Sequence, residues 1–289
     1  MRWEGQQGSS NIEDRRGMGG MPGGRGAGFG CIGLVVVLLI SWVTGIDPRP
    51  LLGILGLVQQ VGTQSAPASQ QAPTGQAKEG DPEAQFIGVV LKETEDTWNT
   101  VFQKSGKRYV EPTLVLFDGR VSSACGMASA AVGPFYCPQD SKVYLDLAFF
   151  RELAQRFHAP GDFAKAYVVA HEVGHHVQNL LGISDKVSAA QQRAHSQEEA
   201  NAYSVKLELQ ADCLAGVYGH FTQQVLDPGD VEAGLRAAAS IGDDMIQKQA
   251  QGYVAPESFT HGSSEMRVKW LKRGLDVGDP SACDTFKGN

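Results

Sequence analysis

A short pattern in the middle of the chain, His171-Glu172-Val173-Gly174-His175, constrains the fold more than any other feature. His171 and His175 are four positions apart, so on an α-helix they lie on one face, one turn apart. Both imidazoles can then reach a single metal ion. Glu172 lies one step around the helix, where its carboxylate suits a water molecule near the metal. The pattern therefore predicts a helix that carries two metal ligands and one general base.

The flanking sequence favours a long helix around this pattern. Helix-forming and apolar residues at 164–170 lead into it, and Gly182 is suited to end it. A chance match on a surface helix is the alternative. In a helix with the composition of a buried one, however, His and Glu side chains without partners are costly. The H-E-x-x-H pattern is typical of zinc peptidases, so we expect Zn²⁺ at this site.

A second helix supplies the other expected groups. Catalytic zinc needs a third protein ligand and an open position for water. Residues 196–221 have the composition of a long helix, on which Glu208 and Asp212 are four apart and share a face. We predict Glu208 as the third ligand and Asp212 as the acceptor of a hydrogen bond from a liganding histidine. A solvated carboxylate pair is the alternative, with Glu198 and Glu199 as the next choices for the ligand.

These motifs resemble known peptidases. H-E-x-x-H followed by E-x-x-x-D on a second helix is similar to the gluzincin type. Nearly the whole chain resembles the bacterial neutral zinc metallopeptidase family, the YpfJ-like proteins. The matching segments are 1–5 with 13–16, 133–138, 171–178, and 260–262 with Arg267. The resemblance implies an α+β fold, a mostly helical zincin-like domain with a small β-sheet. It implies little about substrates.

The front of the chain differs in composition from the rest. Residues 1–28 are rich in Gly, Arg and Met and predict a disordered N-terminus. Residues 29–46 are apolar and uncharged, which predicts a transmembrane helix near the lower limit of length. A cleaved signal peptide is the alternative, but no small-residue cleavage site follows directly. Residues 47–82 predict an interfacial segment and a flexible linker, which leaves 83–289 as one zinc metallopeptidase domain.

Charge around the apolar segment predicts its orientation. Arg15, Arg16 and Arg25 precede it, so the positive-inside rule places the N-terminus in the cytoplasm. We therefore expect a single-pass protein of the cell (inner) membrane with a periplasmic or extracellular catalytic domain. The net charge of −7 argues against a nucleic-acid partner. The sequence does not indicate an oligomeric state.

Five cysteines are present, and Cys31 lies in the apolar segment. The other four allow three pairings, and an even number in an outward-facing domain predicts two disulfides. We favour a clamp between Cys125 and Cys137 and a bond from Cys213, near Glu208, to Cys283 in the tail. Zinc held by cysteines is the alternative, but the spacing lacks a C-x-x-C pair.

Short strands are expected before the H-E-x-x-H helix, at 113–117, 121–125 and 143–147, with helices at 84–105 and 149–157. Residues 125–137 are our candidate for the rim of the active site, where an edge strand binds the substrate backbone. A plain structural hairpin is the alternative.

Two residues near the C-terminus complete the expected site. His261 lies on a loop and is predicted to donate a hydrogen bond to the oxyanion of a tetrahedral intermediate. Arg267 would assist it or fix the loop. We do not expect His176 to be a ligand, because it lies on another helical face.

The sequence thus predicts a membrane-anchored zinc endopeptidase that acts on protein or peptide substrates. Zinc held by His171, His175 and Glu208 would activate a water molecule, and Glu172 would move its proton to the leaving amine. A catalytically silent binding module is the alternative, although such a protein has no need of Glu172. A structural zinc protein is less favoured, because no fourth ligand is evident.

Overall fold

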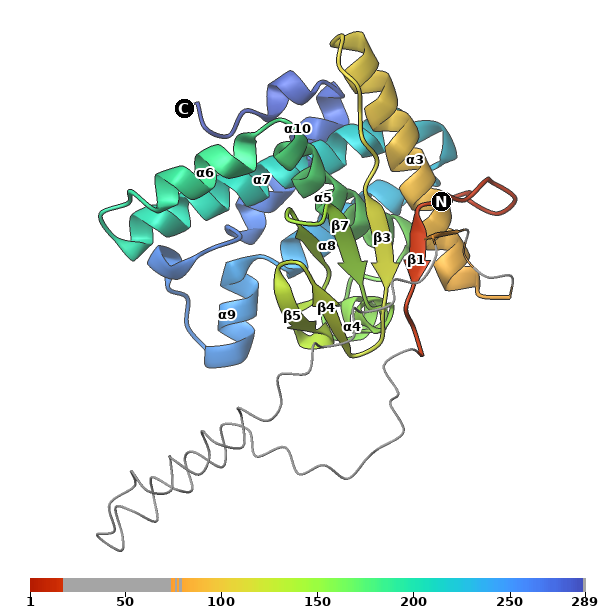
Figure 1. The fold of residues 1–289 in the computed structure, drawn as a ribbon. Helices are drawn as coiled ribbons and strands as arrows, with labels where there is room; N and C mark the ends of the chain where they lie inside the picture. The colour runs from red at the N-terminus through yellow and green to blue at the C-terminus, as the bar shows by residue number, and fades with distance from the viewer. Residues whose placement is uncertain (18–73, 76, 78–79, 288–289) are drawn as a thin grey trace, which may run out of the picture. The chain divides into compact units, whose positions relative to one another are not determined.

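The computed structural model describes residues 1–17, 74–75, 77 and 80–287 (Figure 1). All of them belong to one compact unit, so residues 1–17 fold together with residues 80–287. The predicted transmembrane helix at 29–46 and most of the predicted linker lie outside the described residues. Among the residues that are described, no helix is both long enough and apolar enough to cross a membrane.

Five strands form a mixed sheet in the order β2-β1-β3-β7-β6. They are β1 (Ile12–Asp14), β2 (Thr74–Gly75), β3 (Thr113–Leu116), β6 (Phe135–Cys137) and β7 (Lys142–Leu145). The three central strands β1, β3 and β7 are parallel, and the edge strands β2 and β6 are antiparallel to their neighbours. A separate hairpin consists of β4 (Arg120–Ser123) and β5 (Gly126–Ser129). The strands predicted at 113–117, 121–125 and 143–147 are confirmed to within two residues.

Helices make up most of the described chain, which confirms the α+β class. They are α3 (Pro82–Lys104), α4 (Ala148–Gln155), α5 (Asp162–Leu180), α6 (Ile183–Gln191), α7 (Gln197–Phe221), α8 (Asp230–Ser240), α9 (Asp243–Gln251) and α10 (Ser264–Val277). The first of these begins after Asp81, whose side chain caps it by accepting the N–H of Ala84. Helix α7 begins in the same way, with Ser196 accepting the N–H of Glu199. Short 3-10 turns lie at 130–132, 223–225, 256–258 and 280–283.

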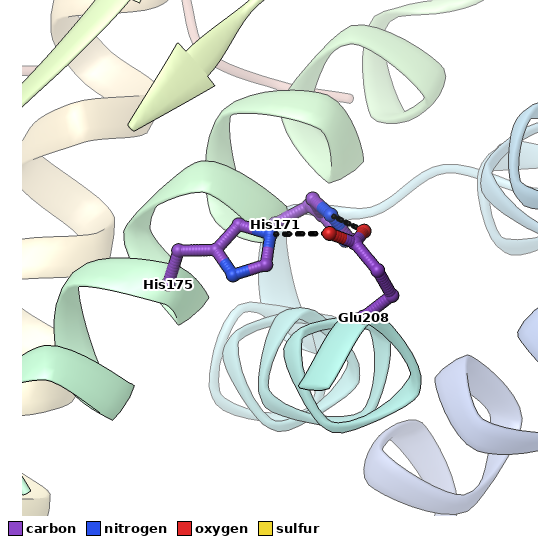
Figure 2. A group of neighbouring side chains, drawn as sticks. All are labelled: His171, His175 and Glu208. Atoms are coloured by element: carbon purple, nitrogen blue, oxygen red, sulfur yellow. Dashed lines mark hydrogen bonds and ion pairs between the residues drawn. The ribbon is translucent and has the colours of Figure 1, made fainter. Parts of the chain in front are cut away.

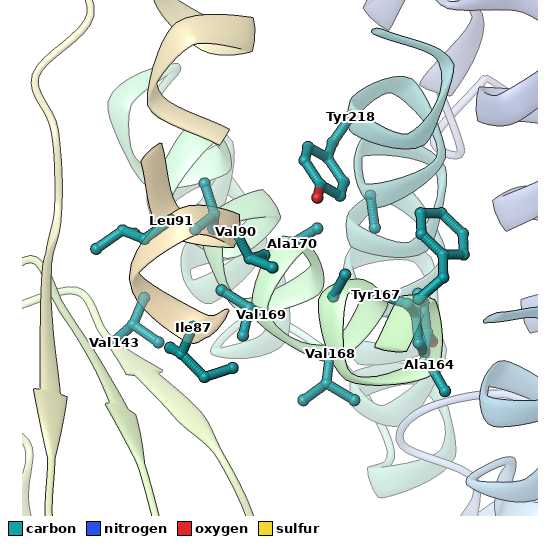
Figure 3. Close-up of a cluster of buried hydrophobic side chains, with 14 of the residues drawn as sticks. Ile87, Val90, Leu91, Val143, Ala164, Tyr167, Val168, Val169, Ala170 and Tyr218 are labelled. Carbon is teal, nitrogen blue, oxygen red and sulfur yellow. The ribbon is translucent and has the colours of Figure 1, made fainter. Parts of the chain in front are cut away.

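The main hydrophobic core surrounds α5, the helix that carries the H-E-x-x-H pattern. In Figure 3, Ile87 and Val90 of α3 approach Val169 of α5, with Val143 of β7 nearby, and Tyr218 of α7 lies at the other side of the cluster. These side chains are almost completely inaccessible to solvent. Because α5 is covered by the sheet, α3, α7 and α8, its position and rotation are fixed by apolar packing.

The predicted disorder of residues 1–28 is wrong for its described part, residues 1–17. Strand β1 lies between β2 and β3, and Ile12 is buried in the core. Charged side chains also hold this segment: Glu13 is almost fully buried and accepts hydrogen bonds from Lys142 and Arg15. The domain therefore does not begin at residue 83. The sequence prediction was wrong because it treated the polar composition of this segment as a sign of disorder. The buried carboxylate of Glu13 is instead compensated by Lys142, which lies far along the chain.

The sheet also contradicts the predicted single-pass topology. One crossing between residues 29 and 46 would place β1 and β3 on opposite sides of a membrane. The two strands are paired, with Ile12 opposite Leu114, so they lie on the same side. The intervening chain starts and returns at one sheet, since β2 also pairs with β1.

We expect an epitope inserted at the exposed Gly5 turn and a tag appended after Asn289 to be on the same side of any membrane. The reason is that the strand pairing permits no separation of the two segments. Accessibility to an impermeant label in intact and permeabilised cells measures this. Labelling of the two positions from opposite sides would contradict the sheet and restore the single crossing.

Candidate metal centre and cleft

Glycine residues allow the helices of the site to approach one another closely. A Cβ atom at Gly174 of the H-E-x-x-H pattern would lie 3.0 Å from the backbone oxygen of Ala211 in α7. Similarly, a side chain at Gly216 of α7 or Gly274 of α10 would overlap the backbone of the opposite helix. These contacts bring α7 against α5 on one side and against α10 on the other. They therefore place side chains from three helices around one point.

At this point the three predicted metal ligands come together. One side-chain atom each from His171, His175 and Glu208 lies within 4.8 Å of the others. Glu208 reaches from α7 toward both histidines of α5, as Figure 2 shows. Its two carboxylate oxygens lie 3.1 Å from Nε2 of His171 and 3.4 Å from Nε2 of His175. Two imidazole nitrogens and one carboxylate form the ligand set that catalytic zinc prefers, so the residues fit this metal.

Asp212 occupies the position that the sequence predicts for it. Nδ1 of His171 donates to Oδ1 of Asp212 at 2.9 Å, which leaves Nε2 facing the ligand cluster. Burial opposes the charged form of His171, but Asp212 and Glu208 raise its pKa to about 10. A zinc ion that binds here at neutral pH would therefore have to displace a proton from this ring.

Arg267 has a different role from the two that the sequence suggests. It is almost fully buried on α10, and its Nε and Nη2 atoms each donate to one oxygen of Asp212 at 2.9 Å. Burial alone would raise the pKa of Asp212, whereas Arg267 and His171 lower it to about 2. Tyr167, one turn before His171, also donates to Asp212 at 2.6 Å. Asp212 is thus held ionised and immobile behind His171.

Two side chains of this network were missed by the sequence analysis. Tyr167 could have been found, because it lies four positions before His171 on the same helical face. Gln178 is the other: its Oε1 atom lies 2.9 Å from Nδ1 of His175. It is three positions after His175, but a glutamine in an amphipathic helix gives no distinctive signal.

Glu172 lies beside the ligand cluster and lines the same cavity. It is 9% exposed, and burial raises its pKa, although the two neighbouring histidines act in the opposite direction. A carboxylate whose pKa is raised accepts a proton more readily than an ordinary surface glutamate. This is the property that a general base near neutral pH requires.

His261 also faces the cavity, from the loop before α10. Its Nδ1 atom lies 3.1 Å from Oδ1 of Asp243, and the other oxygen of Asp243 accepts the backbone N–H groups of residues 260, 261 and 262. The hydrogen bond to Asp243 raises the pKa of His261. Asp243, at the start of α9, was not predicted. It fixes both the loop and the imidazole ring.

The cavity around these groups has a volume of about 660 Å³. One wall consists of residues 130–136, so part of the predicted segment 125–137 lines the cavity, while its role in binding the substrate backbone stays a prediction. Within it, β6 is an edge strand of the sheet, and β7 is its only strand neighbour among the residues that the structure describes. The remaining walls are mostly apolar side chains on or directly after α4, α5, α8 and α9, namely Phe149, Phe157, Val168, Ile241 and Ile246.

Both favoured disulfides are present. Cys125 is bonded to Cys137 and joins the β4–β5 hairpin to strand β6. Cys213 is bonded to Cys283 and ties α7 to the C-terminal segment. Because the four cysteines are paired in this way, none of them points to a cysteine-ligated zinc site.

His176 and Glu199, two further residues that the sequence brings into question, have structural partners. His176 donates from Nε2 to the backbone oxygen of Val110, at 2.6 Å, and packs against Tyr136. Glu198 and Glu199, the alternative third ligands, lie in the first turn of α7. There Glu199 accepts the backbone N–H of His195 and so helps to cap the helix.

Sequence comparison agrees with this geometry. The family described as "Putative neutral zinc metallopeptidase" matches residues 1–286. The chain belongs to this family. It is 48% identical to the uncharacterized protein YpfJ of Escherichia coli K12, over 99% of both chains. It is also 42% identical to the uncharacterized protein Rv2575 of Mycobacterium tuberculosis, over 73% of this chain and 74% of that protein. No solved structure matches the chain significantly.

Proposed function

We propose that the protein is a zinc-dependent endopeptidase. The observation that carries the proposal is the convergence of His171, His175 and Glu208 at one point, with Glu172 lining the same cavity. A bound zinc ion would activate water and polarise the carbonyl group of the scissile bond. The family membership supports a peptidase of this class.

The side chains of the cavity have separate roles in this reaction. Glu172 takes a proton from the attacking water and later gives it to the leaving amine, and its raised pKa suits both steps. His261 donates a hydrogen bond to the oxygen that becomes negative as the carbonyl carbon is attacked. Asp243 keeps His261 oriented and favours its charged form. Asp212 keeps His171 in the orientation needed to bind the metal.

The cavity walls support an extended polypeptide substrate with apolar side chains. In the described part of the chain no strand pairs with the outer edge of β6, so a peptide can add to the sheet there and pass the ligand cluster. Apart from the residues already assigned to the metal centre and its support, the charged side chains that line the cavity are Glu152 and Arg156, both on or beside α4. Two apolar lining residues, Val132 and Ile246, are exposed. Charged substrate residues would therefore find few partners beside the scissile bond.

A peptide library with a single variable position on each side of the cleavable bond tests this function. We expect cleavage that is lost on chelation, restored by zinc, and fastest with large apolar residues. No hydrolysis of any library member by the zinc-loaded protein would refute the proposal. Equal rates for acidic and apolar residues would refute the substrate preference alone.

For His261→Leu, we expect kcat to fall by roughly 10²- to 10³-fold with zinc content unchanged, as for loss of one oxyanion donor. The ring lies outside the ligand cluster, so metal binding does not depend on it. Steady-state kinetics beside metal analysis measure both effects. A variant with normal kcat would remove His261 from the proposed reaction.

We further propose that the domain works in an oxidising compartment outside the cytoplasm. The two disulfides support this location, because cytosolic proteins rarely keep such bonds. The apolar sequence 29–46 is proposed to attach the domain to the membrane from the side on which the domain lies. Fractionation of full-length protein and of a variant lacking residues 29–46 tests the attachment.

A further inference from the structure

The second metal-binding histidine is connected to the C-terminal segment by a chain of two buried glutamines. Nδ1 of His175 lies 2.9 Å from Oε1 of Gln178. Nε2 of Gln178 donates to Oε1 of Gln210, in α7, at 3.1 Å. Nε2 of Gln210 in turn donates to the backbone oxygen of Cys283 at 3.0 Å. Gln178 is completely buried, and Gln210 is 7% exposed.

Backbone carbonyl groups set the direction of this chain. A carbonyl oxygen can only accept, so the oxygen of Cys283 requires the NH₂ group of Gln210 to face it. The carbonyl oxygen of Gln210 then faces Gln178. The backbone oxygen of Leu207 imposes the same orientation on Gln178, whose Nε2 donates to it at 2.7 Å. Each amide therefore has one orientation that satisfies all its partners.

The orientation of Gln178 determines which nitrogen of His175 carries a proton. Because Gln178 presents its oxygen to His175, Nδ1 of that ring must carry a proton and donate it. The lone pair of Nε2 is then the one available to a metal, and Nε2 is the atom that faces Glu208. We call this chain of hydrogen bonds, from His175 through Gln178 and Gln210 to Cys283, the relay. It selects the tautomer of His175 whose Nε2 atom can bind a metal.

We propose that Gln178 and Gln210 are positioning residues, through which the C-terminal segment prepares His175 for the metal. This inference rests on the proposed metal centre and adds to it a part of the chain remote in sequence. The disulfide between Cys213 and Cys283 holds the terminal acceptor of the relay against α7. A second bond, from Thr285 to the backbone oxygen of Lys206 at 2.6 Å, holds the same segment.

The relay differs in kind from the support of the first histidine. His171 donates to an ionised carboxylate, which remains an acceptor in any orientation. His175 instead depends on a neutral amide, which offers an oxygen or an NH₂ group according to its rotation. The backbone oxygens of Leu207 and Cys283 together remove that ambiguity, the first directly at Gln178 and the second through Gln210. The tail therefore contributes to the support of His175 and not to that of His171.

Zinc affinity of the full-length protein, measured by competition with a chromophoric chelator, tests the relay. We expect Gln178→Leu to weaken zinc binding about 10- to 100-fold, as for loss of a residue that orients a ligand. Gln210→Leu should weaken it less, because the oxygen that His175 requires remains. The double variant should be no worse than Gln178→Leu, since Gln210 acts only through Gln178.

Asn201→Leu is the matched control. Asn201 is also a buried amide on α7, and it donates to the backbone oxygen of Glu257, away from the ligands. We expect it to leave zinc affinity unchanged while losing a comparable amount of stability. An equal loss of affinity in Asn201→Leu, or additive losses from Gln178→Leu and Gln210→Leu, would overturn the proposal.

A second measurement separates this inference from the proposed function. In metal-free protein, nitrogen NMR of labelled histidines should show a protonated Nδ1 in His175 whose proton exchanges slowly with water. The slow exchange should be lost in Gln178→Leu and kept in Asn201→Leu. If wild-type protein binds no zinc, the proposed function fails, while this signal still decides whether the relay exists. A rapidly exchanging Nδ1 proton in the wild type would refute the relay.

Discussion

Replacing Glu172 with Gln is expected to reduce peptide hydrolysis at least about a thousandfold while leaving the fold and zinc binding unchanged. The amide has the same shape as the carboxylate but cannot accept the proton of the attacking water. It also cannot return a proton to the leaving amine, so both transfers are lost together. Glu172 does not belong to the ligand cluster of His171, His175 and Glu208, which is why metal content should be preserved.

The rate of cleavage of an apolar peptide measures the loss of hydrolysis. Zinc content and melting temperature show whether metal binding and the fold are unchanged. His261→Leu provides the comparison, because His261 lines the same cavity but its loss should leave the general base working. Hydrolysis by Glu172→Gln at the rate of the wild type would refute the proposed base.

The same variant addresses the alternative of a catalytically silent binding module. A binding module would behave identically as wild type and as Glu172→Gln in any assay of its partner. Comparison of envelope proteins from cells with wild-type protein or Glu172→Gln would then reveal no substrate that accumulates. If the protein is an enzyme, particular proteins should accumulate in the Glu172→Gln strain, and their identification would reveal the substrates.

The grouping of the proposed metal ligands could be predicted from the sequence in part because helical periodicity is local. His171 and His175 share a face on any α-helix, and the same spacing places Glu208 and Asp212 together. The meeting of the two pairs is not local. It depends on Gly174 and Ala211, whose small size permits close contact between α5 and α7. Zinc chemistry indicates that a third ligand is needed, whereas only the packing of α5 against α7 determines where that ligand lies.

Support around the ligands was only partly predictable, because its partners are far apart in the sequence. Asp212 was expected, but the partnership with Arg267 joins α7 to α10. Gln178 ends the family-like segment 171–178 and Asp243 belongs to no motif, but the role of each arises only when a distant loop or carbonyl group is brought to it. Common polar residues acquire such roles through tertiary structure, which periodicity cannot reveal.

The N-terminal residues were misinterpreted for a related reason. A segment with few apolar residues cannot bury enough surface by itself, so disorder is the reasonable expectation. Strand β1 instead adds to an existing sheet, and Glu13 is neutralised by Lys142 of β7. Ser9 and Asn11 likewise donate to Glu95 of α3. Each of these partners lies far along the chain, so no local pattern indicated them.

Removal of Asp212 is expected mainly to lower stability, whereas removal of Glu208 is expected mainly to abolish zinc binding. Asp212→Ala leaves Arg267, which is 3% exposed, without the carboxylate that balances it. An uncompensated buried charge costs about 3–5 kcal/mol of folding free energy. In a domain of this size that corresponds to a melting temperature lower by about 10 °C. The effect of Asp212→Ala on the metal should be milder than loss of a ligand, with zinc affinity reduced about 10- to 100-fold.

Glu208→Ala should instead leave the melting temperature of metal-free protein nearly unchanged and abolish zinc binding. Its side chain is 18% exposed, and the two histidines that it contacts can bond to water in its absence. A double variant, Asp212→Leu with Arg267→Met, provides the control for the buried charge. It should recover most of the stability lost in Asp212→Ala but not the zinc affinity, because His171 still lacks its acceptor. Full zinc binding by Glu208→Ala would require another ligand, and zinc affinity restored in the double variant would show that Asp212 serves the fold and not the metal.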